Sequence, residues 1–327
     1  MMTQRLERHQ VWLYLASILL GLGLGSFVGA GAERLEVLVW PLLGVLLYAT
    51  FTQVALTRLP AAVRDGRFVG TVLLGNFVVV PMVVWALLPF AGPDPAVRIG
   101  VLLVLLVPCT DWFLTFTHLA GGATRLAIAV TPLNLLAQLA LLPVYLWLFL
   151  GGDVGQVVST TRAVTVFTTL ILLPLVAAWA TQVFAGRRRR GALLVRRAGT
   201  LPVPVLALVL LLVAASQVGV VLDATRLLPR LLLVYLAYLV AAALIGLLLA
   251  RGAGLPPASA RALVFSLGTR NSFVVLPVAL ALPAAFEIAV VVVVFQSLVE
   301  LFGMVAYLRL VPRLTGPVGP TGPPAAG

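Results

Sequence analysis

The chain has 327 residues, of which 62% are hydrophobic and 10% are charged, and its mean hydropathy is +1.14. This composition excludes an ordinary soluble globular protein, in which about half of the residues are apolar and about a quarter are charged. The formal net charge of +12 would favour nucleic acid binding in a soluble protein. In a membrane protein such a charge reports topology instead, and we expect no nucleic acid partner.

Ten apolar segments are each long enough to cross a hydrocarbon core of about 30 Å, which takes roughly 20 helical residues. They predict an all-α, polytopic membrane protein of ten transmembrane helices without a separate soluble domain. The first segment is too long for the core of a signal peptide, which has about 7 to 15 apolar residues, so we expect it to remain as a helix. In chain order, the predicted spans cover residues 11–30, 36–55, 69–90, 99–119, 127–150, 163–184, 200–222, 229–250, 262–282 and 287–310.

The basic residues, all 22 of them arginine, are distributed unevenly between the two faces of the predicted membrane protein. Sixteen lie in the tails and the even-numbered loops, and five lie in the odd-numbered loops. Because cytoplasmic segments carry the excess of arginine, this bias predicts an even number of spans and two cytoplasmic termini in a cell (plasma) membrane. The cluster at 187–190 leaves contact with anionic membrane lipid as a second role.

The predicted spans form two similar halves. The last five begin 152 to 164 residues after the first five. Since five is an odd number, the second half enters the membrane with the opposite orientation, as in the inverted repeats of secondary transporters. We therefore expect a first five-helix repeat over residues 1–162, a second, inverted one over 163–314, and a disordered cytoplasmic tail over 315–327.

The fourth and ninth predicted spans each contain a helix-breaking residue that polar residues follow. In secondary transporters such discontinuous helices meet near the midplane and form the substrate and ion sites. The break in the fourth span is Pro108, and the break in the ninth is Gly268. The polar residues that follow are Cys109, Thr110 and Asp111 in the fourth span, and Thr269, Arg270, Asn271 and Ser272 in the ninth.

Two of these residues are charged. A charge near the bilayer centre costs about 2.5 to 3.5 kcal/mol, so we expect Asp111 and Arg270 to face protein or water, and to face each other. Their pairing could be a static ion pair that fixes the packing of the two halves, or it could take part in coupling and substrate binding.

Other apolar segments also contain polar residues: Asn76 in the third, Asn134 and Gln138 in the fifth, and Gln296 and Glu300 in the tenth. The spacing of each pair is i, i+4, which places both side chains on one helix face, where they could line a site or form interhelical hydrogen bonds. The predicted substrate- and ion-binding residues are Asn76, Cys109, Thr110, Asp111, Asn134, Gln138, Arg270, Asn271, Ser272 and Glu300.

The sequence contains no motif for other chemistry. Cys109 is the single cysteine, so an intramolecular disulfide is excluded. There is no glycine-rich phosphate loop, no paired metal-ligand motif and no catalytic dyad. We therefore expect a transporter without a cofactor, and not an enzyme or a receptor.

Several of these segments resemble the bile acid:sodium symporter superfamily, and especially its arsenite efflux permease (arsenical-resistance-3) branch. The similar segments are Asn76 followed five residues later by Pro81, Cys109 at the position of the permeases' functional cysteine, Asn134 and Gln138 followed by Pro143-Val144-Tyr145, and Leu298-Val299-Glu300. The resemblance implies ten helices in a panel domain and a core domain, with the fourth and ninth helices crossing in the core. It also implies efflux of trivalent arsenic driven by the proton gradient, with Cys109 as the soft ligand for the metalloid.

The chain departs from the family pattern at the crossing. Where the family typically carries a glutamate in the ninth helix, this chain has Ser266, Thr269 and Arg270, and an acidic residue, Asp111, follows the cysteine of the fourth helix. We therefore expect a proton rather than sodium as the coupling ion. The leading prediction is proton-coupled efflux of arsenite, and the alternative is sodium- or proton-coupled transport of an organic anion whose carboxylate or sulfonate binds Arg270.

Overall fold

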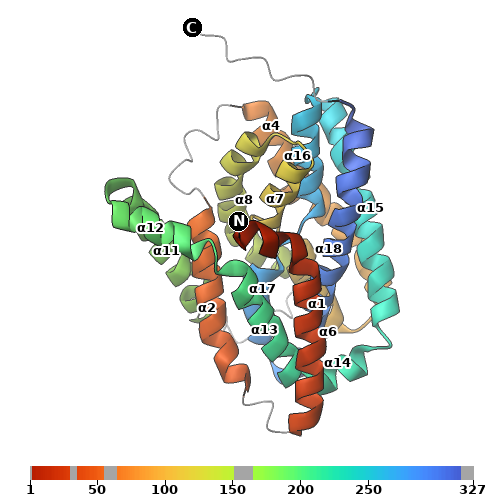
Figure 1. Cartoon of the computed structure of the whole chain (residues 1–327). Coiled ribbons are helices and arrows are strands. Elements are labelled where there is room, and N and C mark those ends of the chain that lie inside the picture. Colours follow the sequence, from red (N-terminus) through yellow and green to blue (C-terminus); the bar gives the residue numbers. More distant parts are fainter. Residues whose placement is uncertain (1, 30–34, 55–64, 151–164, 318–327) are drawn as a thin grey trace.

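The computed structural model describes residues 2–29, 35–54, 65–150 and 165–317, and this part of the chain folds as a bundle of helices (Figure 1). A bent pair, Arg189–Ala198 and Pro202–Ser216, could add one membrane crossing to the continuous stretches that qualify by length and composition. The protein is a polytopic helical membrane protein. Six continuous stretches are long and apolar enough to cross a membrane: Glu36–Gln53, Gly66–Ala91, Thr124–Phe149, Phe167–Arg187, Leu228–Gly252 and Ala284–Thr315.

Two helices of the first half, which follow Asp65 and Asp94, begin where the sequence supplies a side-chain cap. The Asp65 side chain accepts a hydrogen bond from the Phe68 N–H, and the Asp94 side chain accepts one from the Ala96 N–H, just after a proline at the first helical position. The elements are α1 (Met2–Val28), α2 (Glu36–Gln53), α4 (Gly66–Leu74), the π-helical turn η3 (Gly75–Val79), α5 (Val80–Ala91), α6 (Pro95–Leu105), α7 (Trp112–Leu119) and α8 (Thr124–Leu150).

The second half begins with another π-helical turn and ends with a long helix. Its elements are η5 (Phe167–Leu172), α11 (Leu173–Arg187), α12 (Arg189–Ala198), α13 (Pro202–Ser216), α14 (Val218–Ala224), α15 (Leu228–Gly252), α16 (Pro257–Gly268), α17 (Ser272–Leu280), the 3₁₀ turn η6 (Ala284–Phe286) and α18 (Ile288–Thr315).

Each predicted apolar segment coincides with one helix or with successive helical elements, and the segments 99–119 and 262–282 each contain a non-helical break. Most helix ends lie within five residues of the predicted ones. Three differences change the expected elements or their limits. The segment 200–222 was expected to be continuous but is divided at Gln217 into α13 and α14. The first helix begins at Met2 rather than at residue 11, and α18 continues through Thr315, one residue into the expected tail. The expected boundaries at 30, 55 and 163, and residues 318–327 of the tail, lie outside the described residues.

The π-helical turn η3 has a clear cause in the sequence. Pro81 has no N–H, so it cannot donate to the Phe77 carbonyl four residues earlier. That carbonyl instead accepts a hydrogen bond from the Tyr145 hydroxyl of α8. The turn buries Asn76 completely, and it ties together two of the segments that carry the family resemblance.

The helices pack in two sets (Figure 1). The panel group consists of α1, α2, α11, α12 and α13, in which α13 lies between α1 and α2, and α11 lies against α2. The crossing group consists of α4 to α8 and α15 to α18, in which α18 contacts α6, α15, α16 and α17. The two groups meet where α17 contacts α2 and where α1 contacts α18.

Two glycines let α1 approach α13 closely. A Cβ atom at Gly21 would lie 2.3 Å from the Leu211 carbonyl oxygen, and one at Gly25 would lie 2.3 Å from the Ala215 carbonyl oxygen. This is the small-xxx-small arrangement that allows two membrane helices to pack backbone against backbone. Gly23, on the same helix, has no atom within 4 Å of such a Cβ position.

We predict that Gly25→Ala destabilises the protein, because the new methyl group would meet backbone that cannot rotate away. Overpacking of this kind typically costs about 1–3 kcal/mol. The melting temperature of the purified protein in detergent should fall. Gly23→Ala is the matched control and should leave it unchanged or raise it slightly, since alanine favours helix by about 1 kcal/mol. Equal melting temperatures for the two variants would contradict the close contact.

Candidate functional site

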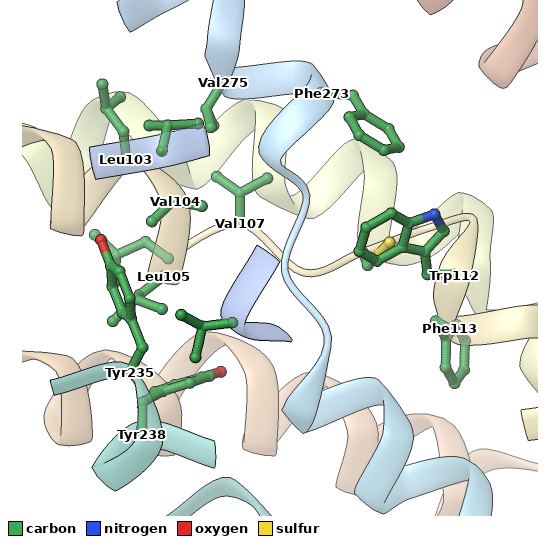
Figure 2. Close-up of a cluster of buried hydrophobic side chains, with 14 of the residues drawn as sticks. Leu103, Val104, Leu105, Val107, Trp112, Phe113, Tyr235, Tyr238, Phe273 and Val275 are labelled. Carbon is green, nitrogen blue, oxygen red and sulfur yellow. The ribbon is translucent and has the colours of Figure 1, made fainter. Parts of the chain in front are cut away.

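Two interrupted helices cross inside the crossing group. The chain is extended between α6 and α7 and again between α16 and α17, and these two segments pair antiparallel at Pro108 and Arg270. The Cys109 N–H donates to the Thr269 carbonyl at 3.1 Å, and the Asn271 N–H donates to the Val107 carbonyl at 2.8 Å. Figure 2 shows the two extended segments crossing beside Val107. Both predicted interruptions are therefore confirmed.

The two interruptions have different causes. Pro108 cannot donate a helical hydrogen bond and disfavours helical geometry in the residue before it. Gly268 has no left-handed backbone. A Cβ atom at this position would lie 2.6 Å from the Tyr307 ring, so glycine is required here for the close approach of α18.

Arg270 is 2% exposed. Both terminal nitrogens of its guanidinium group donate to protein oxygens, whereas Nε has no hydrogen-bond partner among the described residues. One terminal nitrogen, Nη2, donates to Asn76 Oδ1 at 2.8 Å, to the Ser266 carbonyl at 2.8 Å and to the Leu267 carbonyl at 2.9 Å. The other, Nη1, donates to the Leu105 carbonyl at 3.3 Å. These carbonyls belong to the last turns of α6 and α16, which carry unpaired acceptors and the negative end of the helix dipole. The guanidinium therefore stabilises the ends of both interrupted helices.

Glu300 joins the other side of the crossing to α18. Its Oε2 atom accepts from the Arg270 backbone N–H at 2.8 Å and from Gln296 Nε2 at 2.7 Å, and the Ser272 hydroxyl donates to Gln296 Oε1 at 3.1 Å. The expected common face of Gln296 and Glu300 is thus confirmed by a direct hydrogen bond. Glu300 is 1% exposed, and its Oε1 atom has no hydrogen-bond partner among the described residues.

The remaining predicted residues of the two breaks lie around this network. The Asn271 side chain accepts from the Val274 N–H, which caps α17, and donates to the Thr110 hydroxyl at 3.4 Å. Cys109 is 2% exposed at the crossing. Asp111 is half-buried at the N-cap of α7. The hydrogen bonds of the Arg270 guanidinium go to other groups, so the pairing of Asp111 with Arg270 stays a prediction.

Asn134 and Gln138 are separate from this network. Both lie on α8 and are at most 2% exposed. None of their four amide nitrogen and oxygen atoms has a hydrogen-bond partner in the part of the chain that the structure describes. Leaving a buried polar group unpaired costs about 1–3 kcal/mol, so the hydrogen-bonding capacity of this pair is unmet by the described part of the chain.

Tyr238 is a residue of the site that we did not expect from the sequence. The Arg270 guanidinium lies over its ring, 5.7 Å from the ring centre, and its hydroxyl donates to the Leu267 carbonyl at 2.7 Å. Its position in the sequence could have indicated this role. Tyrosine in membrane helices gathers at the interfaces, whereas Tyr238 lies in the interior of the span 229–250 and needs a buried partner there.

A narrow crevice lies between α1 and α13 of the panel group and α7, α17 and α18 of the crossing group. Its volume of about 10 Å³ is close to the space of a single water, so in this conformation it is closed to larger solutes. Trp112 stacks on Tyr14 across it, with ring centres 6.3 Å apart. It also meets Phe273 edge-on, with ring centres 5.6 Å apart, and Figure 2 shows Trp112 and Phe273. Ile18, Leu206, Leu210 and Leu276 extend the apolar lining, and its hydroxyl groups come from Tyr14, Ser272 and Ser297.

Two comparisons with known proteins gave results. No curated protein matches the chain. A model of the Sodium Bile acid symporter family matches residues 40–224. The match covers more than half of the chain and includes the interruption between α6 and α7. The chain belongs to the sodium bile acid symporter family.

Proposed function

We propose that the protein is a secondary active transporter that moves a small organic anion across the cell membrane by alternating access. The observation that carries this proposal is the crossing of two interrupted helices beside a crevice between two helix groups. In secondary transporters, sites at such crossings become accessible from each side in turn when one group rocks against the other. We further propose ten spans in two inverted repeats, residues 1–162 and 163–314, which accounts for both interruptions as one repeated feature.

The arginines support cytoplasmic termini. Helix α12 lies outside the six continuous apolar stretches and is bent by 40° from α13. Its arginines are exposed together with those just before it: Arg187, Arg188, Arg189, Arg190, Arg196 and Arg197. A short basic helix of this kind suits the surface of a membrane that carries anionic lipid. We place it, and both termini, on the cytoplasmic face of the plasma membrane.

The crevice supports an organic anion as the solute. Its aliphatic and aromatic lining fits an apolar body. Ser272 and Phe273 are the first two residues of α17, so the positive end of this half-helix faces the crevice. The N-terminus of α7 is less suitable for an anion because Asp111 occupies its N-cap. We therefore propose that the anionic group binds at α17, while Arg270 remains with its protein oxygens.

Filling the crevice should prevent solute binding. Overpacking costs about 1–3 kcal/mol, and each 1.4 kcal/mol is tenfold in an equilibrium constant. We expect Leu210→Trp to weaken the uptake of a labelled bile acid into proteoliposomes roughly tenfold or more. Leu208→Trp, on the exposed face of the same helix, is the control and should transport normally. Normal uptake by Leu210→Trp would contradict the crevice as the binding site.

We propose that Glu300 carries the coupling proton. Ionisable residues inside membrane proteins commonly serve as proton relays, and Glu300 has an unpaired oxygen and a direct bond to the crossing. Glu300→Gln should abolish uptake driven by a pH gradient but retain exchange of labelled for unlabelled solute, because exchange needs no net proton movement. Glu287→Gln, an exposed carboxyl at the N-cap of the same helix, should keep both activities. Gradient-driven uptake that survives in Glu300→Gln would exclude this role.

Arsenite efflux is the second candidate, because the only cysteine lies at the crossing. Cys109 is buried and does not line the crevice, so we expect Cys109→Ser to transport organic anions normally. An arsenite-sensitive host should grow equally well with the intact protein and with the Cys109→Ser variant. If the intact protein instead protects that host and the Cys109→Ser variant does not, the metalloid is the solute.

A further inference from the structure

The guanidinium of Arg270 lies in what we call the oxygen seat: Asn76 Oδ1 and the carbonyl oxygens of Leu105, Ser266 and Leu267. All four hydrogen bonds are 2.8 to 3.3 Å long. Each of the four residues that supply an oxygen is completely buried. The donor set is oxygen only, and three of its members are main-chain carbonyls, which cannot change their charge.

An oxygen seat of this composition suits a small cation. In transporters with discontinuous helices, unwound carbonyls and the C-terminal ends of half-helices coordinate the sodium ion. Here the C-terminal turns of α6 and α16 supply the carbonyls, and each contributes the negative end of its dipole. The amide of Asn76 completes the set and is held in place because its nitrogen donates to the Ser266 hydroxyl at 2.9 Å.

The same seat does not fit sodium in this chain. The positive charge of Arg270 already occupies it, and a second cation would be brought beside the first in a buried region where like charges repel strongly. No carboxyl oxygen belongs to the seat to offset that repulsion. The Oε2 oxygen of Glu300 is engaged by the Arg270 backbone N–H and by Gln296.

We propose that Arg270 is a covalently attached substitute for a coupling cation, and that this member of a sodium symporter family binds no sodium at the crossing. Which cation the oxygen seat binds does not depend on the proposed function. Only its consequence, transport that does not depend on sodium, rests on the proposed function.

The test compares the purified protein in sodium, choline and guanidinium chloride at equal ionic strength. The melting temperature of the intact protein should be the same in low-millimolar amounts of all three salts, and labelled sodium should not bind saturably. In Arg270→Ala the seat loses its cation. We expect sodium or free guanidinium ions to raise the melting temperature of this variant by several degrees above its value in choline.

Arg251→Ala, which removes an exposed arginine at the end of α15, is the control and should respond to none of the salts. Saturable sodium binding by the intact protein would overturn the proposal, as would a folded Arg270→Ala that is indifferent to both cations. If Arg270→Ala folds in none of the salts, sodium binding by the intact protein still decides. These measurements report ion binding and not transport. A result against the oxygen seat would therefore not contradict the proposed transport function, and a protein that fails to transport would not contradict the oxygen seat.

Discussion

The contact between the Arg270 guanidinium and the carbonyl ends of α6 and α16 is the interaction on which the rest of the site depends. A helix that ends inside a membrane leaves carbonyls without partners, and each would cost several kcal/mol in hydrocarbon. The guanidinium satisfies three of them at once and balances the negative ends of two helix dipoles. Two extended segments can therefore be stable in the buried core of the helix bundle.

This arrangement gives the two sides of the crossing different chemistry. The C-terminal ends of the half-helices point to an oxygen seat that favours positive charge, and the N-terminus of α17 faces the crevice, where negative charge is favoured. Glu300 contacts the crossing between them through the Arg270 backbone. A protonation change at Glu300 and the arrival of an anion would thus act on the same short stretch of chain, which is the requirement for coupling.

The sequence predicted the parts of the site that depend on local rules. Pro108 and Gly268 marked both interruptions, and the i, i+4 spacing of Gln296 and Glu300 predicted their shared face. The partners of Arg270 could not be predicted, because three of them are main-chain carbonyls that become available only when two distant helices end at the same place. The seventh segment divides at Gln217, although neither the last turn of α13 nor Gln217 itself is a proline or glycine; the nearest glycine, Gly219, lies within α14. The crevice depends on the packing of α1 against α13. The spacing of Gly21 and Gly25 allows a close helix contact, but it does not identify α13 as the partner.

We propose that solute passes through the crevice when the panel group moves against the crossing group. The most direct test is to join the two groups across the crevice in a Cys109→Ser background, with Ile18→Cys on α1 and Ser297→Cys on α18. A short bifunctional thiol reagent should abolish uptake of the labelled solute into proteoliposomes, and a reductant that cleaves the link should restore it. The double-cysteine variant and either single-cysteine variant should be active before the reagent is added. A protein that is fully cross-linked and still transports at its original rate would exclude a movement of the two groups against each other as a step of transport.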